Sequence, residues 1–169
     1  MVKNHNILVN FLICFMCFSL VSCNMGKTDF PVDSQGYPED NIILINGEEY
    51  SIDVEYNTDP EKTPEPTVIE IKRQEKIKIV VADHDFYPSD WCIEETEGIT
   101  ATTYTSSYSE NKSDDMPDGA SGGLRIFEIT AEEDAKEIVL MHKVYSLNEE
   151  NKQTEDVLCV YQQVIIKLS

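Results

Sequence analysis

The sequence predicts an all-β fold. Short runs in which apolar and polar residues alternate follow one another along most of the chain, separated by clusters of Gly, Pro, Asn, Asp and Ser. An Asn-Gly pair between two apolar runs adds a hairpin signal. Only residues 131–137 (AEEDAKE) have a helical composition, and a turn is the better interpretation of so short a segment.

The first expected element is a β-hairpin around Asn46-Gly47. Residues 41–45 (NIILI) and 48–56 (EEYSIDVEY) flank this pair, and both turn residues accept the positive φ of a type I′ turn. The second run predicts a half-buried strand, because four apolar or aromatic residues alternate with polar ones: Tyr50, Ile52, Val54 and Tyr56.

Seven further short strands are expected after the hairpin. They lie at residues 67–72, 76–81, 91–95, 99–105, 124–130, 137–147 and 156–168. Seven short strands within about 100 residues are typical of an immunoglobulin-like β-sandwich, although the Cys–Trp–Cys spacing of antibody domains is absent. The predicted fold is therefore an immunoglobulin-like β-sandwich with an extra N-terminal β-hairpin.

The N-terminal segment has the pattern of an export signal. Lys3 is the only charged residue before Lys27, and the apolar run from Ile7 to Val21 is shorter than the roughly 20 residues of a bilayer span. The run ends in Leu20-Val21-Ser22-Cys23, which resembles a bacterial lipobox and implies lipidation of Cys23. An ordinary signal peptide, or a membrane anchor that contains a Cys, is the alternative.

These patterns divide the chain into four parts. Residues 1–22 are the expected lipoprotein signal peptide, 23–40 a tether, 41–65 the hairpin with a Pro-rich linker, and 66–169 the main domain. Acyl chains on Cys23 would hold the protein on a membrane of the cell envelope, on an outer-membrane, periplasmic or surface side.

The charge balance limits the possible partners. The chain carries 32 Asp and Glu against 13 Lys and Arg, a net charge of −19. Removal of residues 1–22 takes away one Lys and no acid, which leaves −20. Such a chain is unsuited to nucleic acid or to a polybasic contact with lipid, so membrane contact is expected through the N-terminal lipid only. The charge favours solubility, and a monomer is expected.

Two cysteines remain for the folded domain once the signal peptide and Cys23 are set aside. Cys92 and Cys159 each lie in an apolar, strand-like run. An oxidising compartment permits a disulfide between them, whereas two buried free thiols are equally compatible with these runs and are the favoured interpretation.

Residues suited to catalysis are scarce. His84 lies in Asp83-His84-Asp85, which could supply metal ligands but is more simply a solvated turn, and His142 is expected to pack within a strand. Asp114, Asp115 and Asp118 do not have the spacing of an EF-hand. No P-loop, dinucleotide-binding fingerprint or nucleophile elbow is present, so we expect no enzyme, no cofactor and no metal site.

Three loops are better candidates for a binding function, because Trp and Tyr are enriched at binding hot spots and Gly allows close approach of the backbone. Trp91 could instead be a core residue, and each loop could be an ordinary connection. The candidate contact residues are Tyr87, Pro88, Ser89, Asp90 and Trp91 in the first loop, Gly119, Ala120, Ser121, Gly122 and Gly123 in the second, and Val144, Tyr145 and Ser146 before the third.

The order of these features resembles the chagasin family of cysteine-protease inhibitors over roughly residues 66–169. Pro88 and Ser89 stand at the Pro-Thr of that family's NPTTG-type motif, and GASGG followed by LRIFEITA resembles its GxGG motif and strand. Tyr87 and Trp91 replace the Asn and Gly of the first motif, Ala120 replaces a Gly of the second, and the RPW motif is missing, with Val144-Tyr145-Ser146 as the nearest equivalent.

The resemblance implies an inhibitor of papain-like or related cysteine proteases, in which the three loops on an immunoglobulin-like sandwich block the active-site cleft. The alternative from the residues alone is a non-enzymatic envelope lipoprotein that binds a glycan or another protein. A glycan site would use exposed aromatic residues, for which Tyr104, Tyr108 and Tyr145 are the candidates.

Overall fold

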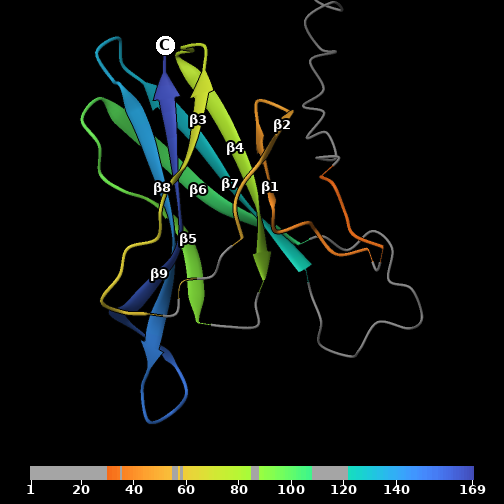
Figure 1. Cartoon of the computed structure of the whole chain (residues 1–169), viewed down its shortest axis with the longest axis vertical. Coiled ribbons are helices and arrows are strands. Elements are labelled where there is room, and N and C mark those ends of the chain that lie inside the picture. The colour runs from red at the N-terminus through yellow and green to blue at the C-terminus, as the bar shows by residue number, and fades with distance from the viewer. Residues whose placement is uncertain (1–29, 35, 55–56, 58, 85–87, 108–121) are drawn as a thin grey trace, which may run out of the picture.

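A computed structural model describes residues 30–34, 36–54, 57, 59–84, 88–107 and 122–169, which form two packed β-sheets (Figure 1). The first sheet has the order β2-β1-β4-β7-β6, with β1 (Ile42–Ile45), β2 (Glu48–Ser51), β4 (Lys76–His84), β6 (Ile99–Ser107) and β7 (Gly122–Ala131). The second has the order β3-β9-β8-β5, with β3 (Thr67–Ile71), β5 (Ser89–Ile93), β8 (Glu137–Leu147) and β9 (Gln153–Leu168). The described chain contains no helix, which confirms the predicted all-β sandwich.

The core lies between the two sheets and follows from the alternation of each strand. Side chains of one parity on β4 and β7 face side chains of one parity on β8 and β9, so both layers bury their apolar rows in a common interior. The most completely buried side chains are Phe127, Ile43, Ile77, Ile79, Ile138, Leu140, Ile166, Val81 and Val164.

The N-terminal hairpin is confirmed. Asn46 and Gly47 have φ values of 52° and 86°, and Ile45 pairs with Glu48 across the turn. Strand β1 also pairs with β4, so the hairpin widens the first sheet. The predicted continuation of the second strand to residue 56 is wrong, because β2 ends at Ser51 and the chain crosses to the second sheet. There the Asp53 N–H donates to Thr67 Oγ1 at 3.1 Å.

The segment before the hairpin packs on the outer face of the first sheet. Phe30 is buried, and Val32 forms an isolated bridge with Pro38. The side chains that Phe30 joins are Leu44, Val80, Ala82, Leu124 and Ile126. The expectation of a free tether is therefore wrong for the described residues from Phe30 onward, since a single aromatic side chain fixes this segment to the sheet.

The Pro-rich linker also packs on the sandwich. The Asn57 side-chain amide donates to the carbonyl oxygens of Lys62 at 2.5 Å and Val160 at 3.1 Å, and its oxygen accepts from the Asp59 N–H at 3.1 Å. These bonds fold the linker back on itself and attach it to β9.

Most strand predictions match the structure to within a few residues. Strand β8 has the predicted bounds, whereas β4 extends to His84 and β9 begins at Gln153, which shortens the third loop to residues 148–152. The β8–β9 hairpin reaches beyond the ends of the other strands (Figure 1). A turn, as predicted, connects β7 to β8.

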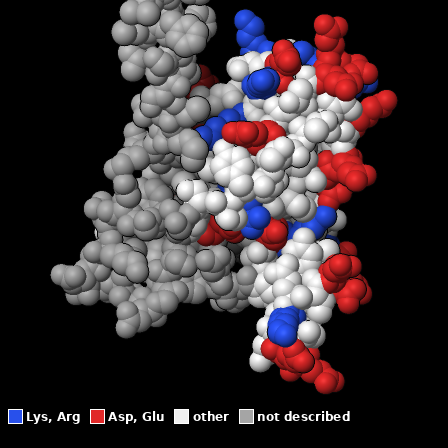
Figure 2. Space-filling view, turned by 180° about the vertical axis from the view of Figure 1, so that it is seen from behind, with Lys and Arg blue, Asp and Glu red and all other residues white. Residues whose placement is uncertain are grey.

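Many of the charged side chains lie on the surface of this sandwich (Figure 2), whereas Asp83 is buried. On the face seen in Figure 2, Asp and Glu follow one border and gather at the two ends, and further acidic and basic side chains are scattered over the surface between them.

Candidate functional site

The strand ends next to the three candidate loops lie at one end of the sandwich. His84 at the end of β4 pairs with Gly122, Ser107 at the end of β6 pairs with Gly123, and Ser89 at the start of β5 pairs with Val144 of β8. We call this the loop end. Strands β4, β6 and β8 run toward it and β5, β7 and β9 run away, so all three connections begin and finish there.

Most of the first candidate loop that the structure describes is strand rather than loop. Ser89, Asp90 and Trp91 belong to β5, and the Pro88 carbonyl accepts a hydrogen bond from the Tyr145 N–H at 2.7 Å. This bond brings the first and third candidate segments together. Tyr87 lies outside the described residues.

Trp91 is a core residue, which was one of the two sequence interpretations. Its side chain is only 4% exposed and joins the main core cluster. The imidazole of His142 stacks on its indole, and Tyr161 contacts that imidazole edge-on with ring centroids 5.7 Å apart. The Trp91 side chain is therefore too deeply buried to contact a partner, and the prediction that it contacts a protease directly is wrong.

His142 connects the start of β5 to β9. Its Nε2 lies 3.1 Å from Ser89 Oγ, and its Nδ1 lies 3.4 Å from Gln162 Oε1. The first distance is that of a nucleophile–base pair in hydrolases. Since Trp91 and Tyr161 pack against the ring, we assign the contact a structural role, which agrees with the prediction of a packed His.

An ion cluster joins the two sheets at the loop end. Arg125 of β7 donates from Nε to Asp83 Oδ2 of β4 at 3.0 Å, and its Nη2 lies 3.0 Å from the same oxygen. The same Nη2 also pairs with Asp90 Oδ1 of β5 in the other sheet. The side chains of Asp83 and Arg125 are 9% and 19% exposed, so the expectation that Asp83 lies in a solvated turn is wrong.

Burial affects the protonation of Asp90 in this cluster. Loss of hydration raises the pKa of Asp90 above its usual value, and the negative charge of Asp83 raises it further, while Arg125 opposes both effects. Asp90 thus lies inside the protein's own charge network, and sequence reasoning missed Arg125 as its partner.

A usable signal for this cluster was present in the sequence. Arg125 has the strand parity of the core residues Phe127 and Ile129, and Asp83 has the parity of Ile79 and Val81. Two opposite charges in the inward phase of neighbouring strands predict an internal ion pair.

The second candidate loop overlaps the described residues only at Gly122 and Gly123, which begin β7. Gly119, Ala120 and Ser121 lie outside them, as do Asp114, Asp115 and Asp118. A Cβ on Gly123 would stand 3.2 Å from the Asp83 carbonyl oxygen. The close approach that this glycine permits is therefore between two strands of the protein, not between the protein and a partner.

The third candidate segment is the end of β8. Val144 is buried, whereas Tyr145 and Ser146 are half-buried, and the Ser146 carbonyl accepts from Thr154 Oγ1 at 3.1 Å. Burial raises the pKa of the Tyr145 phenol, and the neighbouring Cys92 and Asp90 raise it further. The structure makes Val144 a packing residue, so its predicted direct contact with a protease is wrong.

Cys92 and Cys159 are free thiols, as favoured from the sequence, but each is half-buried rather than fully buried. Burial raises the pKa of both thiols. The Cys92 Sγ lies 3.6 Å from the Met141 carbonyl oxygen, and Lys143 beside it pairs with Glu94. Neither thiol is therefore activated as a nucleophile.

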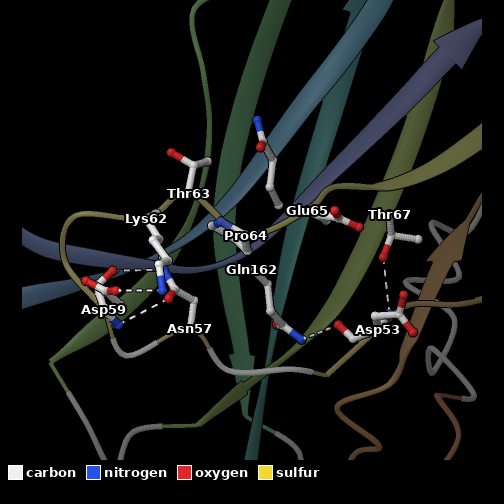
Figure 3. Close-up of a pocket in the computed structure, with 10 residues that line it drawn as sticks. Asp53, Asn57, Asp59, Lys62, Thr63, Pro64, Glu65, Thr67 and Gln162 are labelled. Atoms are coloured by element: carbon white, nitrogen blue, oxygen red, sulfur yellow. Dashed lines mark hydrogen bonds and ion pairs between the residues drawn. The ribbon is translucent and has the colours of Figure 1, made fainter.

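A polar cavity of about 580 Å³ lies where the linker crosses β9 (Figure 3). Asp59 and Lys62 pair on one side of it, and Gln162 lies between them and Asp53, whose carbonyl accepts from Gln162 Nε2 at 2.9 Å. The lining residues are Asp53, Asn57, Asp59, Lys62, Thr63, Pro64, Glu65, Thr67, Gln162 and Gln163. Sequence reasoning, which took this segment for a linker, missed the cavity.

Neither a metal centre nor a membrane span is found in the part of the chain that the structure describes. Within it, no three His, Cys, Asp or Glu side chains gather in a way that could hold a metal ion. The same residues include no helix with the length and apolar character needed to cross a bilayer.

Comparison with known proteins identifies no relative: no family model, no curated protein and no solved structure matches the chain.

Proposed function

We propose that the protein inhibits papain-like or related cysteine proteases and that its loop end occludes the active-site cleft. The observation that carries the proposal is the convergence of the three loop-bearing pairs of strand ends at one end of a rigid sandwich. The chagasin-like order of the motifs in the sequence supports the same assignment.

The strand order is compatible with the immunoglobulin-like part of this proposal. With β3 to β9 taken as strands A to G, β4-β7-β6 has the order B-E-D and β9-β8-β5 has the order G-F-C. These are the two sheets around which the immunoglobulin fold is built. In that scheme the three candidate loops are the B–C, D–E and F–G connections.

A binding surface built on neighbouring strand ends of one sandwich suits a protease cleft. The target would be a thiolate paired with an imidazolium, and a rigid scaffold that presents several loops together loses little entropy when it binds. We assign direct contact to Tyr87, Pro88, the Gly119–Ser121 stretch and Ser146. Trp91 and Val144 support these segments from inside the sandwich, and the half-buried Asp90 supports them through its ion pair with Arg125.

The test is titration of the full-length protein, purified in detergent, against papain with a fluorogenic peptide substrate. We expect stoichiometric loss of activity. Replacing residues 85–88 with a Gly-Ser segment of the same length should abolish inhibition and leave the melting temperature unchanged. The replacement stops before Ser89, because Ser89 and Asp90 hold β5 through His142 and Arg125.

The matched control replaces the exposed pair Glu133 and Asp134 with Gly and Ser, in the β7–β8 turn at the opposite end of the sandwich. This variant should inhibit like the wild type. Full inhibition by the 85–88 variant would refute the assignment of the first loop, and no inhibition by the wild type of any papain-like enzyme would refute the function.

We also propose that the protein is a lipid-anchored envelope protein attached through Cys23. Changing Cys23 to Ser should move the protein from the membrane fraction to the soluble fraction of the producing cell. Retention of the Cys23→Ser variant in the membrane fraction would contradict lipidation at this position.

A binding module for a polar ligand such as a glycan is the second candidate, and the polar cavity at Gln162 favours it. The aromatic residues first considered for such a site do not support it. Tyr104 lies on β6 of one sheet and Tyr145 on β8 of the other, and Tyr108 lies outside the described residues. Polysaccharide binding without protease inhibition would favour this candidate.

A further inference from the structure

Arg125 of β7 links three strands at the loop end. Its guanidinium pairs with Asp83, the penultimate residue of β4, and with Asp90, the second residue of β5. The first candidate loop connects these two strands. Arg125 itself lies two residues after Gly123, where the second loop returns to the sheet. One guanidinium therefore contacts both ends of the first loop and stands at the end of the second.

The cluster crosses between the two sheets. Asp83 and Arg125 belong to the five-stranded sheet, whereas Asp90 belongs to the four-stranded sheet. Backbone pairing fixes β4 against β7 and β5 against β8, but it does not fix one sheet against the other. The ion pair between Arg125 and Asp90 supplies a direct link between the layers at this end, beside the packing of the core.

The geometry requires arginine. A planar guanidinium presents several N–H donors in a fixed fork and can bond two carboxylates in different directions, which a lysine ammonium does less well. Here Nε and Nη2 both reach Asp83, and Nη2 also reaches Asp90. Asp83 and Arg125 are mostly buried, whereas the Asp90 side chain is 35% exposed, so water screens the Arg125–Asp83 pair less than the Arg125–Asp90 pair.

We propose that Arg125 is a positioning residue for protease inhibition, which fixes the ends of β4 and β5, where the first loop begins and finishes, relative to the start of β7 by holding Asp83 and Asp90 together. This inference rests on the proposed inhibitory function. It also changes the role of Asp90, which supports the binding surface from within rather than touching the protease. Loss of the guanidinium would allow the spacing between the ends of β4, β5 and β7 to vary, so binding would lose preorganisation.

The experiment compares two arginines at opposite ends of the sandwich. Arg73 donates from Nη1 to the Glu132 carbonyl at 3.0 Å and from Nη2 to the Ala135 carbonyl at 2.5 Å. It thus fixes the β7–β8 turn, far along the strands from the loop end. Arg73→Gln and Arg125→Gln each remove one guanidinium that ties two segments together, so Arg73→Gln controls for a general loss of stability.

Inhibition of papain by full-length protein in detergent is then measured well below the melting temperature of each variant. We expect Arg125→Gln to raise the inhibition constant at least about 10-fold and Arg73→Gln to leave it unchanged. Arg125→Lys should recover only part of the loss. Asp90→Asn should reproduce part of the effect and should add little when combined with Arg125→Gln, because both changes break the same pair.

The outcomes separate this inference from the function on which it rests. If the wild type inhibits papain and Arg125→Gln inhibits it with equal potency, the positioning role is overturned and the inhibitor assignment remains. Equal losses in Arg73→Gln and Arg125→Gln would also overturn it, since general destabilisation would then account for both. No inhibition by the wild type would overturn the two proposals together. If Arg125→Gln does not fold, the inhibition constant of Asp90→Asn is compared with that of Arg73→Gln instead.

Discussion

The imidazole of His142 stacks on the indole of Trp91 with ring centroids 4.7 Å apart and planes inclined by 14°, although the two residues lie on different strands. They are directly paired across β5 and β8, so the stack is a cross-strand contact on the inner face of the second sheet. The stack places the polar imidazole ring against the core. The two ring nitrogens contact Ser89 Oγ and Gln162 Oε1.

His142→Ala should destabilise the protein by about 2 kcal/mol, because it opens a cavity beside Trp91 and removes a hydrogen-bonding partner from Ser89 and Gln162. Urea denaturation followed by the fluorescence of Trp91, the only Trp of the chain, measures this loss. Glu133→Ala, in an exposed turn, should change stability by less than about 0.5 kcal/mol. Equal stability of the two variants would argue against the role assigned to His142.

The free energy of unfolding should depend on pH in the acid range because Asp90 gains or loses a proton there. Burial raises its folded-state pKa above the usual 3.8, so the folded chain holds this proton more tightly than the unfolded chain. The contribution of Asp90 to the free energy of unfolding therefore falls as pH rises from about 3.8 through the folded-state pKa.

Urea denaturation of the wild type and of Asp90→Asn between pH 3 and pH 7 tests this sign. The wild type should lose stability relative to the variant as pH rises across that window, and the difference should level off above it. Asp156→Asn changes an exposed carboxyl on β9 and is the matched control. A difference that grows in favour of the wild type with rising pH would contradict the raised pKa.

Gly47→Ala should cost about 1–2 kcal/mol, since Gly47 has a φ of 86° and an L-residue with a Cβ is strained there. No atom lies within 4 Å of the Cβ position, so the cost comes from the backbone alone. Thermal unfolding of Gly47→Ala and of Glu49→Ala, an exposed change in the same hairpin, makes the comparison. An unchanged melting temperature in Gly47→Ala would mean that the turn relaxes without penalty.

Both thiols of the folded domain should react slowly. Because burial raises the pKa of Cys92 and Cys159, each has a smaller thiolate fraction at pH 8 than a free cysteine. Alkylation by iodoacetamide, mapped by mass spectrometry, should be several-fold slower in the native protein than in urea. Native rates that match those in urea, or recovery of a Cys92–Cys159 disulfide, would contradict this account.

Local signals predicted the local structure well. The Asn46-Gly47 turn needs positive φ at two successive residues, and that requirement is visible in two letters of sequence. The alternation along residues 137–147 gave the bounds of β8 because an apolar residue lies at nearly every inward position. In contrast, the alternation after Tyr50 suggested a longer β2, since sequence does not show where a strand leaves one sheet for the other.

The parts of the site that depend on contacts between distant segments could not be predicted in the same way. Phe30 stands in a polar run and became a core residue only because an apolar outer face of the first sheet was available to cover. Asn57 holds the linker through a bond to the Val160 carbonyl, more than a hundred positions away. Asp90 was assigned to a contact surface, and only the fold shows that Arg125 lies within reach of it.

The parallel pairing of β3 with β9 has a consequence for how the protein is made. Thr67 pairs with Val164 and Ile71 with Leu168, so the first strand after the linker pairs with a strand that lies six strands later in the sequence. Contacts between such distant segments slow folding, because a long loop must close before they form. The second sheet is therefore completed only after β9 has been synthesised, and β3 has no partner on that side until then.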